Sequence, residues 1–241
     1  MSNEIVIQGV PLWYFETNCY VVADTGTGKA VVIDAPGEAD KIAGILDKLG
    51  CEPVAILHTH GHIDHIGGAG PLSRAKGGIP AYIHEFDRYR IEHPERQLGG
   101  LAAVLRHLDL EPPEELRSLQ DGDIVDLGGF PLEVVFTPGH TEGHVCFRLR
   151  GLQATVHAPL LGIGEPQPVD DILFSGDHLF AGSVGRTDLP GGDWAQLLES
   201  LRSKILGLPD ETLVLPGHGP YTTIGRERLV NPFVHEAAAA L

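Results

Sequence analysis

The sequence predicts an α/β fold in which two β-sheets are sandwiched by helices within a single domain. Apolar runs rich in valine and isoleucine recur between glycine-bounded turns, and segments with helical periodicity alternate with them in both halves of the chain. No linker, low-complexity tract or tandem repeat divides the 241 residues. A chain of this length can bury most of its apolar surface in one continuous core. We therefore expect one domain over residues 1–241.

The apolar runs and the helical patterns follow one another along the chain. Eight runs are predicted strands: Ile5–Ile7, Tyr20–Val22, Val31–Ile33, Val54–Leu57, Leu132–Phe136, Val145–Leu149, Ile172–Phe174 and Leu213–Leu215. Six segments are predicted helices: Glu38–Leu49, Pro71–Lys76, Glu85–Ile91, Arg96–Leu108, Asp193–Leu206 and Thr223–Leu229. Residues 152–170 depart from this pattern because they contain three prolines and two glycines. That segment is predicted to be an inserted loop or hairpin.

Charge and cysteine content exclude several classes of function. The formal net charge is −16 with histidines neutral, so the surface repels phosphodiester backbones and no nucleic-acid partner is expected. Cys19, Cys51 and Cys146 form no Cys-x-x-Cys pair and predict neither a disulfide framework nor a zinc ribbon. The N-terminus lacks a basic start followed by an apolar run, and no stretch approaches the roughly 18 apolar residues of a membrane span. We expect a cytoplasmic protein without a membrane partner, and the sequence leaves its oligomeric state open.

Four potential metal ligands lie within six positions, directly after the predicted strand Val54–Leu57. They are His60, His62, Asp64 and His65. Side chains two residues apart on an extended loop point the same way, so His60 and His62 face one cation. Asp64 and His65 are adjacent and can reach a second cation nearby. The cluster therefore predicts a centre for two metal ions.

Three further loops each place one ligand after an apolar strand and a small residue: His140, Asp177 and His218. Taken singly, each of these residues could cap a helix or line the surface. Seven ligands that share one placement rule indicate a metal centre instead. Four neighbours match no ligand position and are expected to support the ligands or to pack: Asp34, His58, His144 and His178.

These seven ligands, in this order, resemble the metallo-β-lactamase superfamily over nearly the whole chain. The resemblance implies a four-layer αβ/βα sandwich with the site at one edge of the two sheets. It implies two divalent metal ions, for which we expect zinc before iron or manganese, and a bridging water whose pKa falls to near neutral. It also distributes the ligands: His60, His62 and His140 on the first metal, Asp64, His65 and His218 on the second, and Asp177 as the bridge. Asp64 and Asp177 would then be the catalytic carboxylates.

Two segments indicate a branch of this superfamily. The run from Phe174 to Asp193 and the closing Pro216–Pro220 are similar to the short, glyoxalase II-like hydrolases of bacteria. The resemblance implies hydrolysis of a small-molecule thioester such as S-lactoylglutathione by a metal-bridging hydroxide, with the cations stabilising the oxyanion and the thiolate.

The chain departs from the glyoxalase II pattern in three places. Only 23 residues follow His218, so we expect the C-terminal helical domain that grips glutathione to be missing. His178 and Glu142 stand where a threonine and a proline are more usual. The segment 152–170 lies between two of the site loops. These departures leave the acyl group and the thiol carrier open.

Several alternatives remain at this stage. An iron-dependent persulfide dioxygenase shares the fold and a run like Gly185–Asp188, but holds a single iron through the equivalents of His60, His140 and Asp177. The seven ligands do not separate the two classes, whereas the Pro-Gly-His-Gly-Pro closing loop favours hydrolysis. A lactonase is a further alternative. The acidity disfavours a nuclease, and the missing signal peptide disfavours a periplasmic β-lactamase. A non-enzyme with purely structural zinc is also disfavoured, because structural zinc sites are typically closed by four ligands whereas seven ligands for two metals leave positions open.

Arg186 has two interpretations. It lies on the loop that leaves the Asp177 strand, where its guanidinium could bind a substrate carboxylate or fix the loop beside the metals. The alternative is a surface salt bridge to Asp188 or Glu199.

Overall fold

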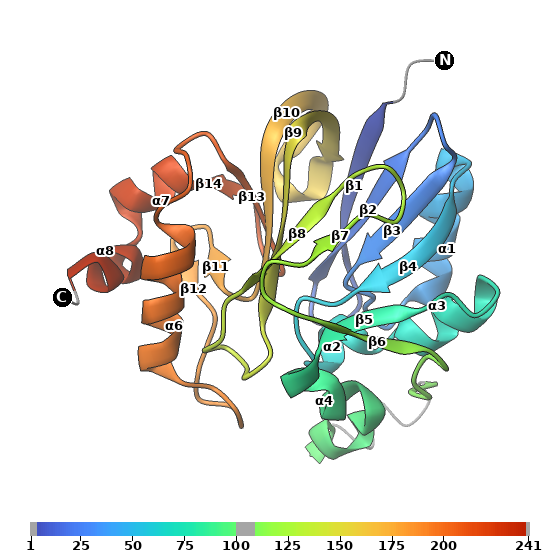
Figure 1. Cartoon of the computed structure of the whole chain (residues 1–241), viewed down its shortest axis with the longest axis horizontal. Helices are drawn as coiled ribbons and strands as arrows, with labels where there is room; N and C mark the ends of the chain where they lie inside the picture. The colour runs from blue at the N-terminus through green and yellow to red at the C-terminus, as the bar shows by residue number, and fades with distance from the viewer. Residues whose placement is uncertain (1–3, 100–108, 240–241) are drawn as a thin grey trace.

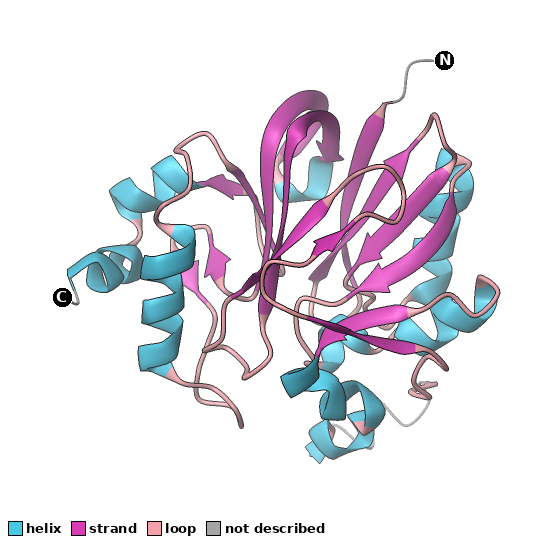
Figure 2. Ribbon diagram, viewed as in Figure 1, coloured by secondary structure: helices cyan, strands magenta, loops and turns pink. Residues whose placement is uncertain are grey.

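The computed structural model describes residues 4–99 and 109–239 and has four layers, helix–sheet–sheet–helix. Strands occupy the centre, with α1–α4 on one flank and α6–α8 on the other (Figures 1 and 2). Within the described residues, twelve strands form one hydrogen-bonded sheet in the order β14-β13-β10-β9-β1-β2-β3-β4-β5-β6, with β8 paired to β9 and β7 to β8. The sheet has two halves, which face each other across the main core.

The first half carries the N-terminal elements. Its strands are β1 (Ile5–Leu12), β2 (Thr17–Asp24), β3 (Lys29–Ile33), β4 (Glu52–Leu57), β5 (Ala81–His84) and β6 (Leu116–Leu119). Its helices are α1 (Ala39–Leu49), α2 (Ile63–Ile66), α3 (Ala69–Ala75) and α4 (Arg88–Glu92), with 3-10 turns η1 (Glu85–Asp87) and η2 (Pro94–Gln97). Strands β1 to β3 pair antiparallel and β3 to β6 parallel.

The second half carries the C-terminal elements. Its strands are β7 (Ile124–Val125), β8 (Leu132–Phe136), β9 (Val145–Ala158), β10 (Ile163–Gly176), β13 (Leu213–Pro216) and β14 (Thr222–Thr223). Strands β11 (Leu179–Phe180) and β12 (Ser183–Val184) form a separate hairpin. The helices are α6 (Trp194–Ser200), which continues as a π-helical turn over Leu201–Ile205, α7 (Ile224–Val230) and α8 (Pro232–Ala239).

Local sequence explains how the outer layers attach. All eight residues of β2 are buried, because helices cover one face of this half and the second half covers the other. Helix α1 buries Ile42 and Leu46, which lie four residues apart on one face. It ends at Gly50, whose φ of 65° is the left-handed conformation that glycine adopts without strain.

The structure agrees with most sequence-predicted elements and adds others. Each of the eight predicted strands lies within an observed strand, and the four-layer αβ/βα fold is confirmed. Strands β5, β6, β7, β11 and β12 and helices α2 and α8 lie outside the predicted elements, and β14 overlaps the first residue of the predicted helix Thr223–Leu229. The two expected sheets are joined edge to edge into one, because β1 pairs in parallel with β9. In this pairing Ile5 lies opposite Ala154 and Gln8 lies opposite His157. Residues 152–170 form the outer half of the β9–β10 hairpin, which a 3-10 turn over Pro159–Leu161 closes.

Two further outcomes concern helices. Of the predicted helix Arg96–Leu108, residues 100–108 lie outside the described residues, and Arg96 lies in the 3-10 turn η2. Within the part of the chain that the structure describes, no helix has the length and apolar character needed to cross a membrane.

Truncating the central core should destabilise the fold strongly. Phe174 of β10 is fully buried and packs edge-to-face on Tyr20 of β2, with ring centroids 5.3 Å apart, so this contact joins the two halves. We expect Phe174→Ala to lower the free energy of unfolding by about 3–5 kcal/mol, the usual cost of removing a buried aromatic ring. Urea denaturation measures this loss. Phe86→Ala is the matched control, because Phe86 is 53% exposed and its removal should have a much smaller effect.

Candidate metal centre

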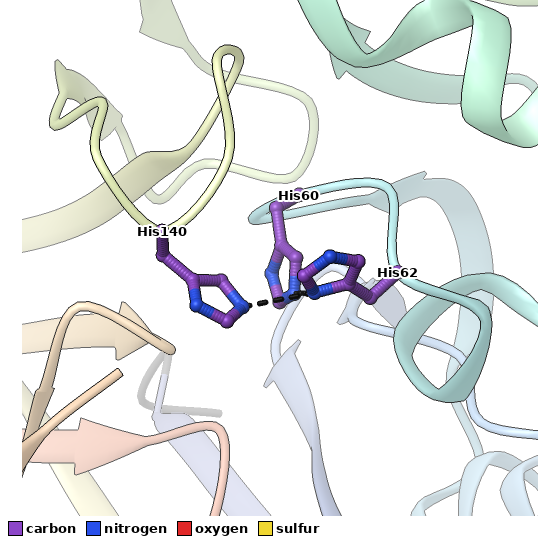
Figure 3. Close-up of side chains that lie close together, drawn as sticks. All are labelled: His60, His62 and His140. Carbon is purple, nitrogen blue, oxygen red and sulfur yellow. Dashed lines mark hydrogen bonds between the residues drawn. The ribbon is translucent and has the colours of Figure 1, made fainter. Parts of the chain in front are cut away.

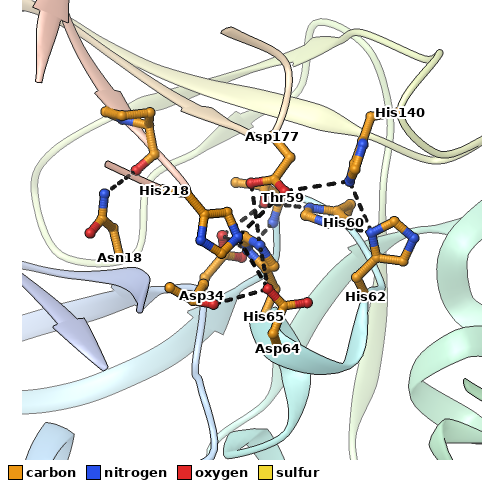
Figure 4. A network of polar contacts seen from close by, with 12 residues as sticks. Asn18, Asp34, Thr59, His60, His62, Asp64, His65, His140, Asp177 and His218 are labelled. Carbon is orange, nitrogen blue, oxygen red and sulfur yellow. Dashed lines mark hydrogen bonds and ion pairs between the residues drawn. The ribbon is translucent and has the colours of Figure 1, made fainter. Parts of the chain in front are cut away.

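Seven potential ligands converge where loops from both halves of the sheet meet (Figure 4). His60 and His62 lie on the loop after β4, and Asp64 and His65 lie on the short helix α2 that follows. His140 comes from the β8–β9 loop, Asp177 from the end of β10 and His218 from the loop after β13. The structure therefore brings together every residue that the sequence nominated as a metal ligand.

Three histidines form the first group (Figure 3). His60 Nε2 lies 3.1 Å from His62 Nδ1, which lies 2.9 Å from His140 Nε2. All three side chains are buried. Burial, with the neighbouring imidazole of His140, lowers the pKa of His62 to about 3, and burial also lowers the pKa values of His60 and His140. The three rings are therefore neutral at physiological pH, which is the form that binds metals.

In His60 and in His140, the hydrogen bond made by Nδ1 fixes which of the two ring nitrogens carries the proton. His140 donates from Nδ1 to the carbonyl oxygen of Arg186 at 2.7 Å, which leaves a lone pair on Nε2. Thr59 donates its hydroxyl to Asp34 at 2.8 Å, so its oxygen accepts from Nδ1 of His60 at 3.1 Å. His60 Nε2 is then also a lone pair directed into the group. Converging lone pairs repel one another unless a cation lies between them, so this donor set fits a metal ion.

Asp64, His65 and His218 form the second group. Asp64 Oδ2 lies 3.4 Å from His65 Nε2 and 3.1 Å from His218 Nε2. His65 donates from Nδ1 to Asp34 at 2.8 Å. Burial would lower the pKa of His65, but the carboxylates of Asp177, Asp64 and Asp34 outweigh it and raise that pKa, so Nε2 offers a lone pair to a metal ion once the ring has lost its second proton. This nitrogen is buried and has no hydrogen-bond partner among the described residues. An orphaned buried atom of this kind is expected where a metal belongs.

Asp177 lies between the two groups. Its carboxylate is 3.5 Å from His140 Nε2 in the first group and 3.3 Å from His65 Nε2 in the second. Its Oδ1 is buried without a hydrogen-bond partner in the described structure. A carboxylate has two oxygens to share, so this position suits a bridge between two cations.

Two of the four neighbouring residues hold the ligands in place. Asp34 accepts from Thr59 N–H at 2.9 Å as well as from His65, and its φ of 57° is a conformation that non-glycine residues rarely adopt. Burial would raise the pKa of Asp34, but His65 and His58 outweigh it and lower that pKa to about 2. His144 accepts from the backbone N–H of Asp177 at 3.1 Å. His58 and His178 are fully buried, and their ring nitrogens find no hydrogen-bond partner in the described residues.

Sequence reasoning missed several supporting residues. Thr17 donates its hydroxyl to Asp64 Oδ2 at 3.0 Å. Asn18 donates its amide to the carbonyls of Pro216 and Gly219 at 2.8 and 2.9 Å, which fixes the loop that carries His218. Both residues are buried at the start of β2. The available signal was the pair of polar residues directly before the apolar run from Cys19 to Ala23.

Glycine is required next to the ligands. A Cβ on Gly217 would overlap Asp177 Oδ1 and lie 2.8 Å from His65 Cε1, and one on Gly185 would overlap the backbone carbonyl oxygen of Asp177. A substitution at either position would push a ligand loop outward.

The Arg186 side chain forms an exposed ion pair in the structure. Its Nε and Nη2 each donate to Asp188 at 2.6 Å, and both side chains are more than 60% exposed. The pair matches the surface interpretation, while the Arg186 carbonyl supports His140.

Arg186→Ala should therefore leave the free energy of unfolding nearly unchanged, because exposed ion pairs contribute little. Thermal denaturation checks this expectation. A contact with substrate would instead lower kcat/KM in Arg186→Ala but not in Asp188→Ala, which keeps the guanidinium and removes only its partner. An early-melting Arg186→Ala with full kcat/KM would show that the side chain is structural.

Comparison with known proteins places the chain in a family. The model of the metallo-beta-lactamase superfamily matches residues 13–170 and 155–218. The chain belongs to the metallo-β-lactamase superfamily. Members of this superfamily are generally metal-dependent hydrolases, and the His and Asp groups described above suit divalent ions.

An uncharacterized protein of Mycobacterium tuberculosis is 42% identical over 233 residues, which cover 95% of this chain and 98% of that protein. Hydroxyacylglutathione hydrolase GloC of Haemophilus influenzae is 34% identical, with 95% and 98% covered.

Solved structures of the superfamily share the fold. BLEG-1, a B3 metallo-β-lactamase, superposes with a TM-score of 0.77 at 35% identity, covering 95% of this chain and 99% of BLEG-1. TTHA1623, solved in a di-iron-bound form, gives a TM-score of 0.72 at 37% identity, covering 93% and 98%. ETHE1 of Myxococcus xanthus gives 0.70 at 23% identity, covering 97% and 90%, which shows the fold alone.

Proposed function

We propose that this protein is a two-metal hydrolase of the superfamily that cleaves a small-molecule thioester such as S-lactoylglutathione. The observation that carries the proposal is the pair of ligand groups linked by Asp177, with lone pairs on His60 and His140 directed inward. The choice of a thioester is supported by 34% identity to hydroxyacylglutathione hydrolase GloC over 95% of this chain.

The chain supplies a charge distribution suited to this chemistry. Two divalent cations would polarise the substrate carbonyl and lower the pKa of water to near neutral. Asp64 and Asp177 partly neutralise such cations. Asp34, Thr59 and the Arg186 carbonyl orient the imidazoles, so the ligand geometry exists before substrate arrives. The formal net charge of −16 supports a small-molecule substrate rather than nucleic acid.

Two relatives define the alternatives that an experiment must separate. TTHA1623, solved in a di-iron-bound form, supports iron as a candidate metal besides zinc. The iron-dependent persulfide dioxygenase, which holds a single iron, stays the alternative from another enzyme class because the seven ligands do not separate the two classes. BLEG-1 is a B3 metallo-β-lactamase, so a β-lactam is an alternative substrate. A lactone is the third.

The deciding experiment pairs a thiol-release assay with an oxygen electrode. Zinc-loaded and iron-loaded protein is given S-lactoylglutathione, glutathione persulfide, a chromogenic β-lactam and a lactone in parallel. We expect thiol release from the thioester with either metal and no oxygen uptake. Oxygen uptake with persulfide in the iron-loaded sample only, without thioester cleavage, would replace the hydrolase with a dioxygenase. Faster turnover of the β-lactam or the lactone would replace the thioester as the substrate.

A further inference from the structure

A buried carboxylate outside the ligand set, Asp87, lies against the three-histidine group. It ends the 3-10 turn η1 and its side chain is fully buried. Its Oδ2 accepts from the backbone N–H of Gly61 at 2.8 Å and from the hydroxyl of Thr141 at 2.6 Å. Its Oδ1 accepts from the backbone N–H of Gly143 at 3.1 Å. Gly61 separates His60 from His62, and Thr141 follows His140, so one carboxylate joins the two loops that carry the first ligand group.

Close packing shows that these loops are pressed against Asp87. A Cβ on Gly143 would lie 2.6 Å from Asp87 N and 2.9 Å from Asp87 Cγ. A Cβ on Gly61 would lie 3.0 Å from the Asp87 carbonyl oxygen and 2.6 Å from Arg90 Cβ. Real Cβ atoms do not approach other atoms so closely, so each loop reaches Asp87 only because it has glycine at that point.

Arg90 compensates the buried charge and extends the connection. Its Nε donates to Asp87 at 3.3 Å, and its Nη2 donates to Glu142 at 2.6 Å and to the carbonyl of Pro190 at 2.7 Å. The Pro190 loop also contains Arg186, whose carbonyl accepts from His140. Gln97 donates to the Gly61 carbonyl at 2.9 Å. The segment 87–97 therefore contacts each loop that positions the three histidines.

Asp87 and Asp34 serve different parts of the centre. Asp34 binds His65 of the second group directly and reaches His60 only through Thr59. The contacts of Asp87 all go to the loops of the first group and to Arg90. We propose that Asp87 is a positioning residue for the His60–His62–His140 subsite: it sets the spacing of the two loops and thereby the affinity of that subsite for its cation, independently of the Asp64–His65–His218 subsite. This inference rests on the proposed two-metal centre.

The test measures zinc affinity in two backgrounds that each leave one subsite intact. His218→Ala keeps the three histidines, and His62→Ala keeps Asp64, His65 and His218. Asp87→Asn is added to each background, because it keeps the size of the side chain but replaces an acceptor oxygen with a donor facing other donors. Competition with a chromophoric chelator gives the Kd for zinc. We expect a loss of roughly 10–100-fold in the His218→Ala background, as is typical when a residue that orients metal ligands is removed. In the His62→Ala background the change should stay below about threefold, well short of that range.

A matched control separates positioning from general destabilisation. Asp171→Asn removes another carboxylate that accepts from an arginine and a threonine, Arg148 and Thr212, and it touches no ligand loop. It should leave the zinc affinity unchanged in both backgrounds. If Asp87→Asn does not fold, Thr141→Val removes the 2.6 Å hydrogen bond alone and should show the same preference with a smaller loss.

Three results would overturn the inference. Equal loss of affinity in the two backgrounds would assign Asp87 a purely structural role, and no loss in either would deny it any role. Absence of zinc binding in both backgrounds would remove the two-metal centre and the inference with it. The measurement involves no thioester, so a chain that binds zinc in the expected pattern but cleaves no thioester would contradict the proposed substrate and leave the role of Asp87 intact.

Discussion

Replacing Asp177 by alanine should lower kcat by orders of magnitude while the domain stays folded. Asp177 lies within 3.5 Å of imidazole nitrogens from both ligand groups: His140 on one side, and His65 and His218 on the other. Its removal takes away the negative charge that offsets the repulsion between two cations, and this repulsion is large where water is scarce. The variant should therefore bind one of the two ions weakly, and the chemistry that needs both should fail.

The measurement combines kcat for thioester hydrolysis, bound metal per chain and circular dichroism. Asp171→Asn is again a suitable control, because Asp171 lies on the same strand β10 and pairs with Arg148 at 2.8 and 2.6 Å, away from the ligands. Near-normal turnover of folded Asp177→Ala would show that Asp177 does not link the two ions. A lower kcat with both ions still bound would assign it a role in orienting the reactants instead.

The buried strands could be predicted because their sequences are continuous apolar runs. Strand β3 reads Lys-Ala-Val-Val-Ile, and all its residues after the lysine are buried. Strand β6 reads Leu-Arg-Ser-Leu and shows no such run, so only its pairing with β5 defines it. The pairing of β1 with β9 joins residues about 150 positions apart, and no local pattern encodes such a contact. Helix α8 is absent from the predicted helices although it starts at Pro232, which is a favourable first helical residue.

The ligands could be predicted for a related reason. Each candidate lies on a loop or short helix that follows an apolar strand, and strand ends gather at one edge of the fold, so residue type and position together select the seven residues that the structure brings together. The residues that orient them carry no such signal. Asp87 lies in the sequence His-Glu-Phe-Asp-Arg-Tyr, which is typical of an exposed helix start, and its bonds to Thr141 and Gly143 span more than 50 residues. The support that Arg186 gives His140 comes from a backbone carbonyl, which is independent of side-chain identity.

Removing the metals should abolish thioester hydrolysis and also lower the thermal midpoint of unfolding. The nitrogens of His60, His62 and His140 converge at 2.9–3.1 Å, and the buried Oδ1 of Asp177 has no hydrogen-bond partner among the described residues, so bound cations would stabilise this arrangement. An ion that binds only the folded chain stabilises it by about 4 kcal/mol when free metal exceeds Kd a thousandfold. For a chain of this size, that corresponds to a shift on the order of 10 °C. Calorimetry of chelated and zinc-loaded protein measures the shift.

The stoichiometry of reactivation gives the sharper test, because the two ligand groups share Asp177 and each offers a different donor set. Zinc is added back to chelated protein in steps, with activity and bound metal measured at each step. If both ions are needed, activity should stay low until the first equivalent has bound and rise as the second binds. His218→Ala is the informative companion: it should still bind one ion at the three histidines and recover part of the thermal shift, yet regain almost no activity. Full activity of the unmodified chain with one ion per molecule would contradict a two-metal mechanism, because the second ligand group would then have no part in the reaction.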